Sequence, residues 1–348
     1  MSFLPSVSII VPVRNSEDNI GYCLQSLIDL DYPDYEIIVV DNNSTDNTRQ
    51  IIVDYPAAVL SEKNIGAYLA RNKGIAAARG EIIAFTDADC RVDRNWLQML
   101  VRHYRSKDVG GVGGNLLPFS PSNLIEEFLS LGKLRIYHSS RISSIGTQGK
   151  HFLSHGLGSA NMSFRKSVLT MVKNFNPHLA DFGGDYDLTW RVQRAGYNII
   201  YDPEAIVYHR MRNSIYSMLS QFHAFGKELP HLLVEQPGNY SYLQIKTYLL
   251  PLLEYRCHLP FRAMITLDFL TLASLLLIMT LLLPSLIPYT VVIFSVVLAG
   301  SIYMTIKALK RSKKIIWIIL FPLLHLLRNC AFSIGKIRGG FKYKVLVL

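Results

Sequence analysis

Cysteine is scarce in the sequence, and the spacing of the few cysteines argues against stabilisation by zinc or by disulfides. The four cysteines form no CxxC pair, and their spacing suits neither a zinc site nor a disulfide framework; they are Cys23, Cys90, Cys257 and Cys330. A reducing compartment is the simpler expectation. A basic leader is also missing before the first apolar run, Val7–Val13, which has only strand length, so no signal peptide is expected.

Acidic residues are nearly absent from the C-terminal part of the chain. Residues 1–210 hold 21 Lys and Arg against 22 Asp and Glu, whereas residues 211–348 hold 15 against 4, so the net charge of +10 arises in the second part. Half of all residues are hydrophobic, and the mean hydropathy is +0.21. Basic residues beside long apolar runs indicate an anionic membrane as partner and argue against nucleic acid.

Two apolar runs in this basic part are close to the roughly 20 residues that a spanning helix needs. They cover residues 269–287 and 289–306, and the very short connection between them predicts a hairpin. Basic residues flank the pair on both sides, which predicts that both ends lie in the cytoplasm. A third run, 315–327, is too short to span, so an interfacial or re-entrant helix is expected over about 315–335. These patterns predict a multi-pass protein of the cell membrane.

The N-terminal part alternates buried strands with amphipathic helices. Val7–Val13 and Tyr35–Asp41 are apolar runs of strand length, and the residues between them have helical spacing. This order predicts an α/β fold with a Rossmann-like, mostly parallel and doubly wound sheet. The glycine-rich stretch Val109–Phe119 is not followed by GK[ST], so it predicts a strand and not a phosphate loop.

The stretch Gly80–Leu97 carries the strongest chemical signal. Its apolar run, Ile82–Phe85, ends in Thr86-Asp87-Ala88-Asp89, and ligands of open α/β sheets bind at the carboxyl ends of strands. Two carboxylates one residue apart suit Mg²⁺ or Mn²⁺, and such an ion suits a diphosphate whose charge it neutralises. The alternative is a strand-to-loop turn that is merely acidic.

Several segments in a fixed order resemble the family 2 glycosyltransferases, which have the GT-A fold. They are VSIIVPVRN, VVDNNSTDNT, NIGAYLARNKGIAAARGEIIAFTDADC, GSANMSFRK and GGDYDLTWR, followed by His209. The resemblance covers about Val7–Arg210. It implies inverting, metal-dependent transfer of a sugar from a nucleotide-diphosphate sugar to an acceptor, with Mn²⁺ or Mg²⁺ as cofactor. The expected organisation is a catalytic domain over 1–212 in the cytoplasm, amphipathic interface helices over 213–262 and a membrane region over 263–348.

The resemblance also implies roles for single residues. The nucleotide sugar would be bound by residues at the strand ends and on the third helix: Pro12, Arg14, Asp41, Arg71 and Asp87. Asp89 would bind the metal directly, and His209 would be a further ligand. Simpler alternatives remain open, namely helix capping for Asp41, a solvated helix charge for Arg71 and a structural role for His209.

Asp185 is the expected general base, because an inverting transfer needs one carboxylate to take the acceptor's proton. The family usually has Glu-Asp where this sequence has Gly184-Asp185, which puts the acceptor contacts near Gly184 in doubt. Asp187 and Arg191 match the family pattern as supporting residues. The alternative is that the two aspartates only cap the helix.

Further features bear on the acceptor and on competing functions. QxxRW, typical of processive polysaccharide synthases of this family, is absent, and its nearest counterpart begins at Gln221; single-residue transfer is therefore expected. A membrane-proximal site favours a lipid-linked acceptor. Two other functions stay open: a nucleotidyltransferase, whose basic glycine-rich loop after the first strand is missing here, and an inactive membrane-bound protein that binds nucleotide sugars or glycans.

Overall fold

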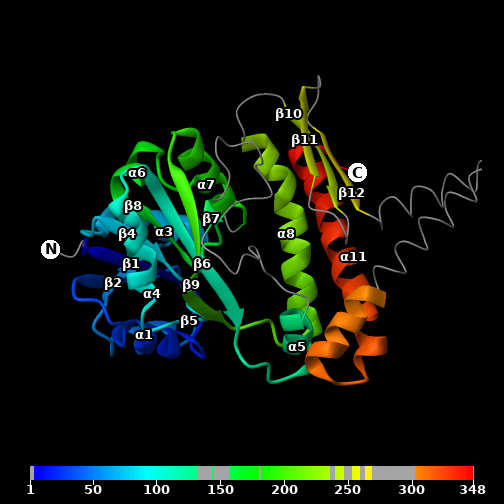
Figure 1. Cartoon of the computed structure of the whole chain (residues 1–348), viewed down its shortest axis with the longest axis horizontal. Coiled ribbons are helices and arrows are strands. Elements are labelled where there is room, and N and C mark those ends of the chain that lie inside the picture. Colours follow the sequence, from blue (N-terminus) through cyan, green and yellow to red (C-terminus); the bar gives the residue numbers. More distant parts are fainter. Residues whose placement is uncertain are drawn as a thin grey trace, which may run out of the picture. The chain divides into compact units, whose positions relative to one another are not determined.

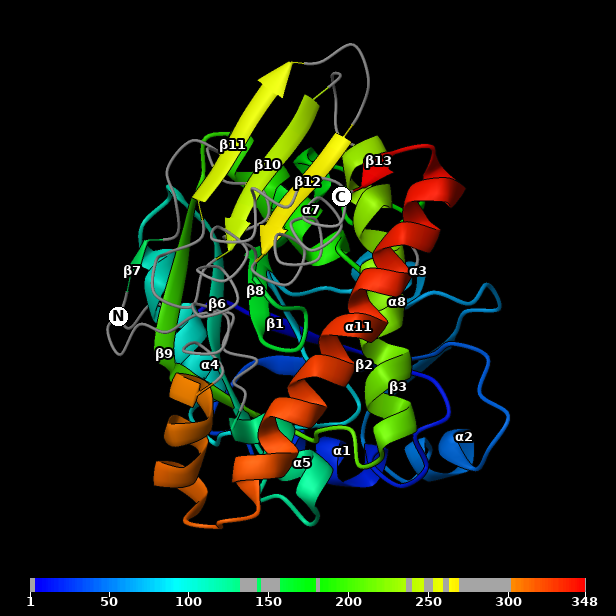
Figure 2. The ribbon, with the colours of Figure 1, turned by 90° about the vertical axis from the view of Figure 1, so that its right-hand side faces the viewer.

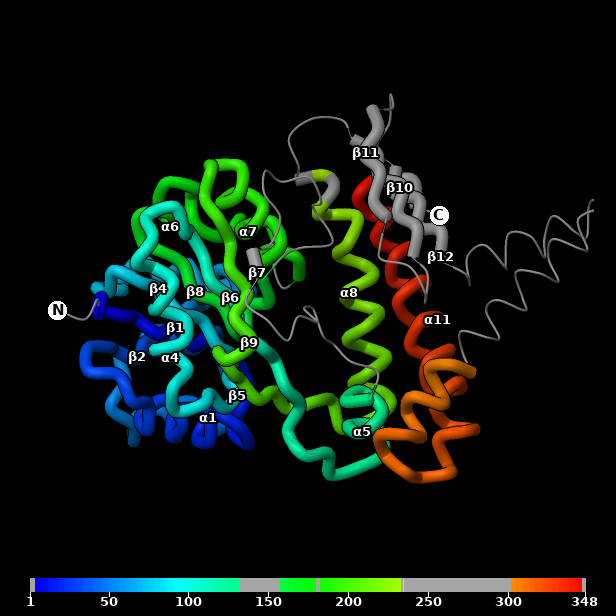
Figure 3. The backbone as a smooth tube through the Cα atoms, in the orientation of Figure 1, coloured from blue at the N-terminus to red at the C-terminus, as the bar shows by residue number. Residues whose placement is uncertain are grey.

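The computed structural model describes residues 4–131, 143–144, 157–179, 182–235, 240–246, 253–258, 263–268 and 302–347 (Figure 1). Figure 3 traces the backbone of the same chain from the N-terminus to the C-terminus. The chain divides into two compact units. The first unit consists of Met1–Ser120 and Arg135–Met211, and the second consists of Pro121–Leu134 and Arg212–Leu348. Each unit is described by itself.

The first unit is built on a mixed sheet in the order β3-β2-β1-β4-β8-β6-β9-β5, with β7 paired to β9 (Figure 1). Its strands are β1 (Val7–Val13), β2 (Tyr35–Asp41), β3 (Ala58–Ser61), β4 (Ile82–Phe85), β5 (Cys90–Val92), β6 (Val109–Pro118), β7 (Ser143–Ser144), β8 (Met162–Arg165) and β9 (Asn198–His209). The helices are α1 (Ile20–Ile28), α2 (Thr48–Ile52), α3 (Ala67–Ala77), α4 (Trp96–Val101), the 3₁₀ helix η1 (Arg102–Arg105), α6 (Lys166–Met171) and α7 (Gly184–Arg194).

The half of the sheet made by the first strands is parallel, as the alternating pattern predicted. β1 pairs in parallel with both β2 and β4, and β2 pairs in parallel with β3. All seven residues of β1 are buried, as expected for a β-branched run at the centre of a sheet. Pro12 is tolerated there because the pairing with β4 ends at Ile10, so that side of the strand needs no N–H donor at Pro12.

The other half of the sheet departs from the mostly parallel arrangement that the sequence predicted. β8 runs antiparallel to β4 and β6, and β5 runs antiparallel to β9. The segment Asn198–His209 forms the single strand β9, which runs parallel to β6. Its register shifts between the pairs Gly114–Asp202 and Asn115–Ile206. This irregularity takes up Pro203, which has no N–H for the ladder.

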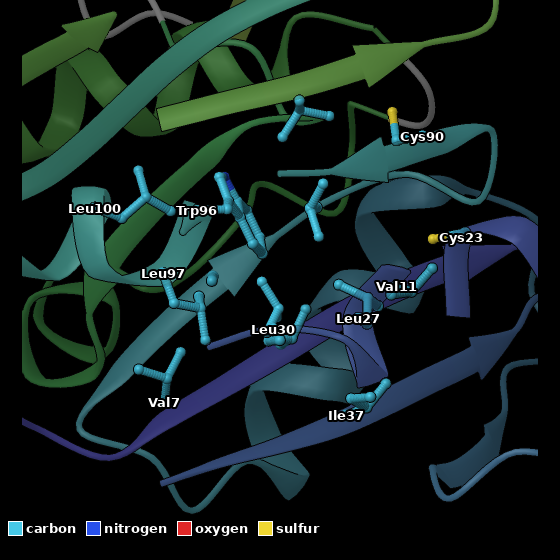
Figure 4. Packing of buried hydrophobic residues seen from close by; sticks show 14 of the residues in the cluster. Val7, Val11, Cys23, Leu27, Leu30, Ile37, Cys90, Trp96, Leu97 and Leu100 are labelled. Atoms are coloured by element: carbon cyan, nitrogen blue, oxygen red, sulfur yellow. The ribbon is translucent and has the colours of Figure 1, made fainter. Parts of the chain in front are cut away.

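Helices cover both faces of the parallel half of the sheet. On one face, residues of β1 pack with α1 and α4 around Trp96, Leu97 and Leu100 (Figure 4). On the other face, α3 approaches so closely that a Cβ on Gly74 would lie 2.6 Å from the side chain of Ile10. This doubly covered sheet leaves the carboxyl ends of its strands, and the loops after them, available for ligands.

The described residues of the second unit include the helices α5 (Leu124–Leu131), α8 (Ile215–Glu235), an unlabelled helix over 302–312 and α11 (Trp317–Tyr343). α8 and α11 lie side by side (Figure 2), with backbones so close that a Cβ on Gly226 or Gly335 would lie 2.0 Å from a carbonyl oxygen of the other helix. Glu127 of α5 accepts hydrogen bonds from Lys314 and from the indole of Trp317, which anchors α5 to the start of α11.

Strands occupy part of the segment for which interface helices were predicted. β10 (Tyr240–Lys246), β11 (Leu253–His258), β12 (Ala263–Asp268) and β13 (Leu346–Val347) form a separate sheet in the order β11-β10-β12-β13. Within 213–262 the helical prediction therefore holds for α8 but not for β10 and β11. The sequence YSYLQIK of β10 has the aromatic and alternating character of a strand.

The membrane predictions meet the structure only in part. The predicted hairpin lies almost wholly outside the described residues, since only 302–306 belong to a described helix. The third segment forms α11, which continues to Tyr343 and so exceeds the predicted 315–335. Among the described residues, α11 is the one helix long and apolar enough to cross a membrane.

Candidate active site

The candidate site lies where β1, β2 and β4 end, because parallel strands present their carboxyl ends at one edge of the sheet. Asn42, directly after β2, ties the loops of this edge together. Its amide group donates to the carbonyl oxygens of Glu62 and Asn64, and its side-chain oxygen accepts from the amide of Gly66, just before α3. The start of α3 is therefore held against the end of β2.

Three of the predicted nucleotide-binding residues lie at the ends of β1 and β2. Pro12 is buried within β1, and Arg14 is exposed just beyond it. Asp41 is buried at the last position of β2, where its carboxylate accepts a hydrogen bond from the amide of Ser44 and lies 3.6 Å from Arg49. Asp41 does not cap the next helix, because the N-cap of α2 is Asn47. The capping alternative for Asp41 is therefore wrong.

Arg71 lies inside the structure, not on a solvated helix face. Its side chain is only 3% exposed, and its guanidinium pairs with the carboxylate of Asp87 at 2.5 Å. The guanidinium carbon lies 5.3 Å from the ring centre of Tyr68 and 5.9 Å from that of Phe175. Among the described residues, no partner reaches the buried Nε of Arg71. The two aromatic rings and one carboxylate fix the positive charge at the end of β4.

Asp89 and His209 meet because β5 and β9 pair in a particular register. Cys90 lies opposite His209 in this antiparallel ladder, and the backbone amide of Arg210 donates to the carbonyl oxygen of Asp89. The Nε2 atom of His209 consequently lies 3.5 Å from Oδ1 of Asp89. The buried Nδ1 atom of His209 has no hydrogen-bond partner in the described part of the chain.

This corner has the donors that a divalent cation requires. An oxygen of Asp89, the sulfur of Cys90 and a ring nitrogen of His209 all lie within 4.8 Å of one another. Burial, followed by the nearby Asp89 and Asp87 charges, raises the pKa of the Cys90 thiol well above its ordinary value. A thiol is a soft ligand, whereas a carboxylate and an imidazole are the donors of this group that fit an ion such as Mn²⁺ or Mg²⁺.

Asp185 is the second residue of α7, and its carboxylate reaches beyond the helix. Oδ2 accepts from the amide of Ser159 at 3.1 Å, while Oδ1 accepts from the amide of Tyr186 and from the hydroxyl of Tyr68 at 3.4 Å. Burial raises the pKa of Asp185, although the two amides and the charge of Arg71 act in the opposite direction. A carboxylate with a raised pKa is suited to accept a proton.

Asp187 and Arg191 form a structural pair on the same helix. The guanidinium donates to the Asp187 carboxylate at 2.9 and 2.7 Å, and it also donates to the carbonyl oxygens of Val172 and Asn174. These bonds tie α7 to the turn after α6. Asp187 thus does more than cap the helix, and its contacts agree with a supporting position.

The structure joins some of the predicted residues and leaves others apart. Tyr68 connects Asp185 to Arg71, and Arg71 connects onward to Asp87. Asp89 and His209 form a second pair, whereas Asp41 is bonded within its own loop. Tyr68, Ser159 and Cys90 were not predicted from the sequence. Spacing could have indicated Tyr68, which lies three residues before Arg71 on one side of α3.

Comparisons with known proteins agree with this architecture. The sequence profile described as Glycosyl transferase family 2 matches residues 8–170. The chain is 32% identical over 221 residues to glycosyltransferase AglE of Haloferax volcanii, a match that covers 61% of this chain and 69% of that protein. It is 27% identical over 247 residues to the pre-mycofactocin glycosyltransferase of Mycobacterium tuberculosis, where the match covers 69% of this chain but only 50% of the relative.

One solved structure resembles nearly the whole chain. The mannosyltransferase PcManGT from Pyrobaculum calidifontis, solved in complex with GDP-Man and Mn²⁺, superposes with a TM-score of 0.55 over 97% of this chain and 88% of its own. The two sequences are 16% identical, so the likeness concerns the fold.

Proposed function

The chain belongs to the family 2 glycosyltransferases, and on this premise we propose that it transfers one sugar from a nucleotide-diphosphate sugar to a lipid-linked acceptor at the cytoplasmic face of the membrane. The acceptor group would be a hydroxyl or a phosphate. The catalytic domain would span about residues 1–212, and the rest of the chain would hold it at the bilayer. Membership of this family supports glycosyl transfer over the two alternatives, a nucleotidyltransferase and an inactive binding protein.

One observation carries the proposal: Asp89 and His209, 120 positions apart in the sequence, lie 3.5 Å apart at the edge where Asp87 and Arg71 also pair. A carboxylate, an imidazole and a buried guanidinium are the groups that a diphosphate with a divalent cation would need. Asp41, Pro12 and Arg14 at the neighbouring strand ends suit the base and the ribose.

Asp89 and His209 would hold Mn²⁺ or Mg²⁺. When bound, the ion supplies positive charge that neutralises the departing diphosphate. Asp87 would face the ribose, and Arg71 would hold its carboxylate in place through a charge-assisted hydrogen bond of 2.5 Å.

Asp185 would act as the general base. Its carboxylate takes the proton of the acceptor hydroxyl while that oxygen forms a bond to the anomeric carbon. The bond from this carbon to the diphosphate oxygen breaks at the same time, and the nucleoside diphosphate leaves with the electron pair. Attack from the face opposite the leaving group inverts the configuration. A phosphate acceptor already ionised would need no base.

The lipid-linked acceptor is inferred from the second unit. α11 has 27 residues and the composition of a membrane helix, and basic residues exceed acidic ones by 15 to 4 over residues 211–348. An apolar helix among basic residues suits a bilayer with an anionic cytoplasmic surface. A site held at this surface meets lipid-linked glycans at high local concentration.

The experiment is a panel of nucleotide sugars, including GDP-mannose and UDP-N-acetylglucosamine, offered to the detergent-purified full chain with Mn²⁺. Each donor is paired with a polyprenyl phosphate, a short-chain phosphate analogue or a free sugar as acceptor. Release of the nucleoside diphosphate, faster with the polyprenyl phosphate than with the short analogue, is the expected result. Equal rates with free sugar and lipid would contradict the lipid-linked acceptor.

A further inference from the structure

Gly184 occupies the position where this family usually has glutamate, and the structure shows why no side chain fits there. A Cβ on Gly184 would lie 2.7 Å from Cδ2 and Cε2 of Tyr68 and 2.9 Å from its Cζ. Real Cβ atoms do not come this close to a ring, and this ring is held on several sides. The side chain of Tyr68 thus takes the space beside the first residue of α7.

The ring of Tyr68 is fixed by its neighbours. It is 3% exposed and stacks on Phe175 with ring centres 5.1 Å apart and planes at 20°. Phe175 is in turn held by Asn72, which donates to its carbonyl oxygen and accepts from its amide. Phe85, at the end of β4, packs edge-on against Phe175 at 5.4 Å. A ring with these contacts cannot swing aside to admit a residue 184 side chain.

The hydroxyl of Tyr68 points at the carboxylate of Asp185. It donates to Oδ1 at 3.4 Å, and the amide of Ser159 donates to Oδ2 at 3.1 Å. Oδ1 also accepts from the amide of Tyr186 at 3.0 Å, so both oxygens have donors, and together these donors fix the plane of the carboxylate. Burial, together with the charge of Asp185, raises the pKa of Tyr68 well above its ordinary value, so the hydroxyl keeps its proton and acts as a donor.

We propose that Tyr68 is a positioning residue: it orients the carboxylate of Asp185 for proton transfer, and its ring fills the space that a side chain at position 184 would occupy. The inference rests on the proposed role of Asp185 as general base. Tyr68 itself takes no proton. The guanidinium of Arg71 lies over the ring of Tyr68, 5.3 Å from its centre. Because Arg71 also pairs with Asp87, Tyr68 lies in a continuous series of contacts from Asp185 to Asp87.

The first test compares Tyr68→Phe in the full chain with the wild type. The probe is nucleoside-diphosphate release from the donor that turns over in the panel, with a sugar hydroxyl or water as acceptor, because an ionised phosphate acceptor would need no base. We expect kcat to fall about 3- to 10-fold, the effect of one hydrogen bond, with KM for the donor unchanged. The acid limb of the pH profile should move to higher pH, because a carboxylate that loses a donor has a higher pKa.

A matched control is Tyr104→Phe, which removes another buried tyrosine hydroxyl, bonded to Ser163 and outside the site. This variant should keep the pH profile of the wild type even if it is less stable. A wild-type kcat and pH profile in Tyr68→Phe would overturn the orienting role. Asp185→Asn separates the two proposals: if it retains full turnover, the base assignment fails, whereas loss of turnover with an unchanged Tyr68→Phe refutes only the present inference.

The second test concerns space and needs no substrate. Gly184→Ala, Tyr68→Ala and the double variant form a thermodynamic cycle read by thermal unfolding. Gly184→Ala should destabilise the wild-type protein because of the clash, and it should cost clearly less in the Tyr68→Ala background. Additive effects of the two substitutions would show that the ring does not exclude a side chain at position 184, which would overturn this half of the inference.

Discussion

Two regions of strand β9 differ in how fully their buried polar groups are hydrogen-bonded. In the middle of the strand, the carboxylate of Asp202 is fully buried and accepts from His103 at 2.6 Å, from Arg102 at 2.9 Å and from the amide of Glu204 at 3.0 Å. Both oxygens are used. At the end of the strand, Nδ1 of His209 is buried without a partner among the described residues.

Unpaired polar atoms also occur around the end of β4. Nε of Arg71 and Oγ1 of Thr86 are also buried and unpaired within the described ranges. An unpaired buried polar atom costs about 1–3 kcal/mol, so this edge of the sheet is less stable than it could be, whereas the Asp202 cluster is saturated. The unpaired donors and acceptors at this edge are groups with which a charged ligand could form hydrogen bonds.

The largest expected effect is at the unsaturated end. Asp89→Ala should lower turnover about 10³-fold, because charge stabilisation of several kcal/mol is lost, while the thermal midpoint changes little. Rates of nucleoside-diphosphate release and a melting curve measure the two quantities. Asp34→Ala is the matched control, since Asp34 is exposed and precedes β2 at the opposite edge of the sheet. Unaltered turnover in Asp89→Ala would show that the end of β9, like its middle, has no role in turnover.

At the saturated end, Asp202→Asn should act on stability. The substitution leaves Arg102 and His103 without their buried partner, and removal of one member of a buried charge pair typically costs about 3–5 kcal/mol. Chemical denaturation of the purified chain measures this loss. Glu204→Gln is the control, because Glu204 pairs with the same arginine but is 63% exposed, and exposed pairs contribute about 0–1 kcal/mol. Equal losses in both variants would contradict the assignment.

The Asp202 cluster also predicts an acid limit of stability. Burial disfavours the charged form of Asp202, but the bonds from His103, the Glu204 amide and Arg102 outweigh it, so the pKa is lowered. A lowered pKa in the folded state gives stability that is present above the unfolded value, about 3.9, and is lost as the pH falls below it. Between pH 6 and pH 3, the melting temperature of the wild type should therefore decrease more steeply than that of Asp202→Asn. An equal decrease in both proteins would contradict this linkage.

The smallest effect should come from Thr86→Val. The hydroxyl of Thr86 is fully buried, and Oγ1 has no partner in the described part of the chain. Its replacement by a methyl group of similar shape should be neutral or stabilising by about 1 kcal/mol or less. A melting curve decides the sign. A marked loss of stability would show that the hydroxyl is used, and the edge would then be less unsaturated than described.

Much of the parallel half of the sheet could be predicted from the sequence. Val7–Val13 and Tyr35–Asp41 are strands with the predicted limits, since a continuous apolar run of that length has few other ways to be buried. The acidic end of β4 was also predicted, because strand ends and ligand sites coincide in such sheets. These inferences needed only local pattern and one general rule of topology.

The remainder depends on contacts between distant segments. β5 has three residues, too few to show a period, and its existence depends on its partner β9. The direction of β8 follows from its neighbours β4 and β6, which no local pattern reports. Tyr68 has the appearance of an ordinary helix residue until Gly184 lies against its ring. The roles of the predicted site residues stay predictions.

The β5–β9 ladder, in which Cys90 lies opposite His209, also has a consequence for folding during synthesis. Asp87 and Asp89 leave the ribosome about 120 residues before His209, which at ordinary elongation rates is roughly 6–24 s. During that interval β5 has no partner strand and Asp89 has no imidazole beside it. A nascent chain stopped before residue 198 would therefore contain α7 and the acidic turn, yet it would lack the corner where Asp89 and His209 meet.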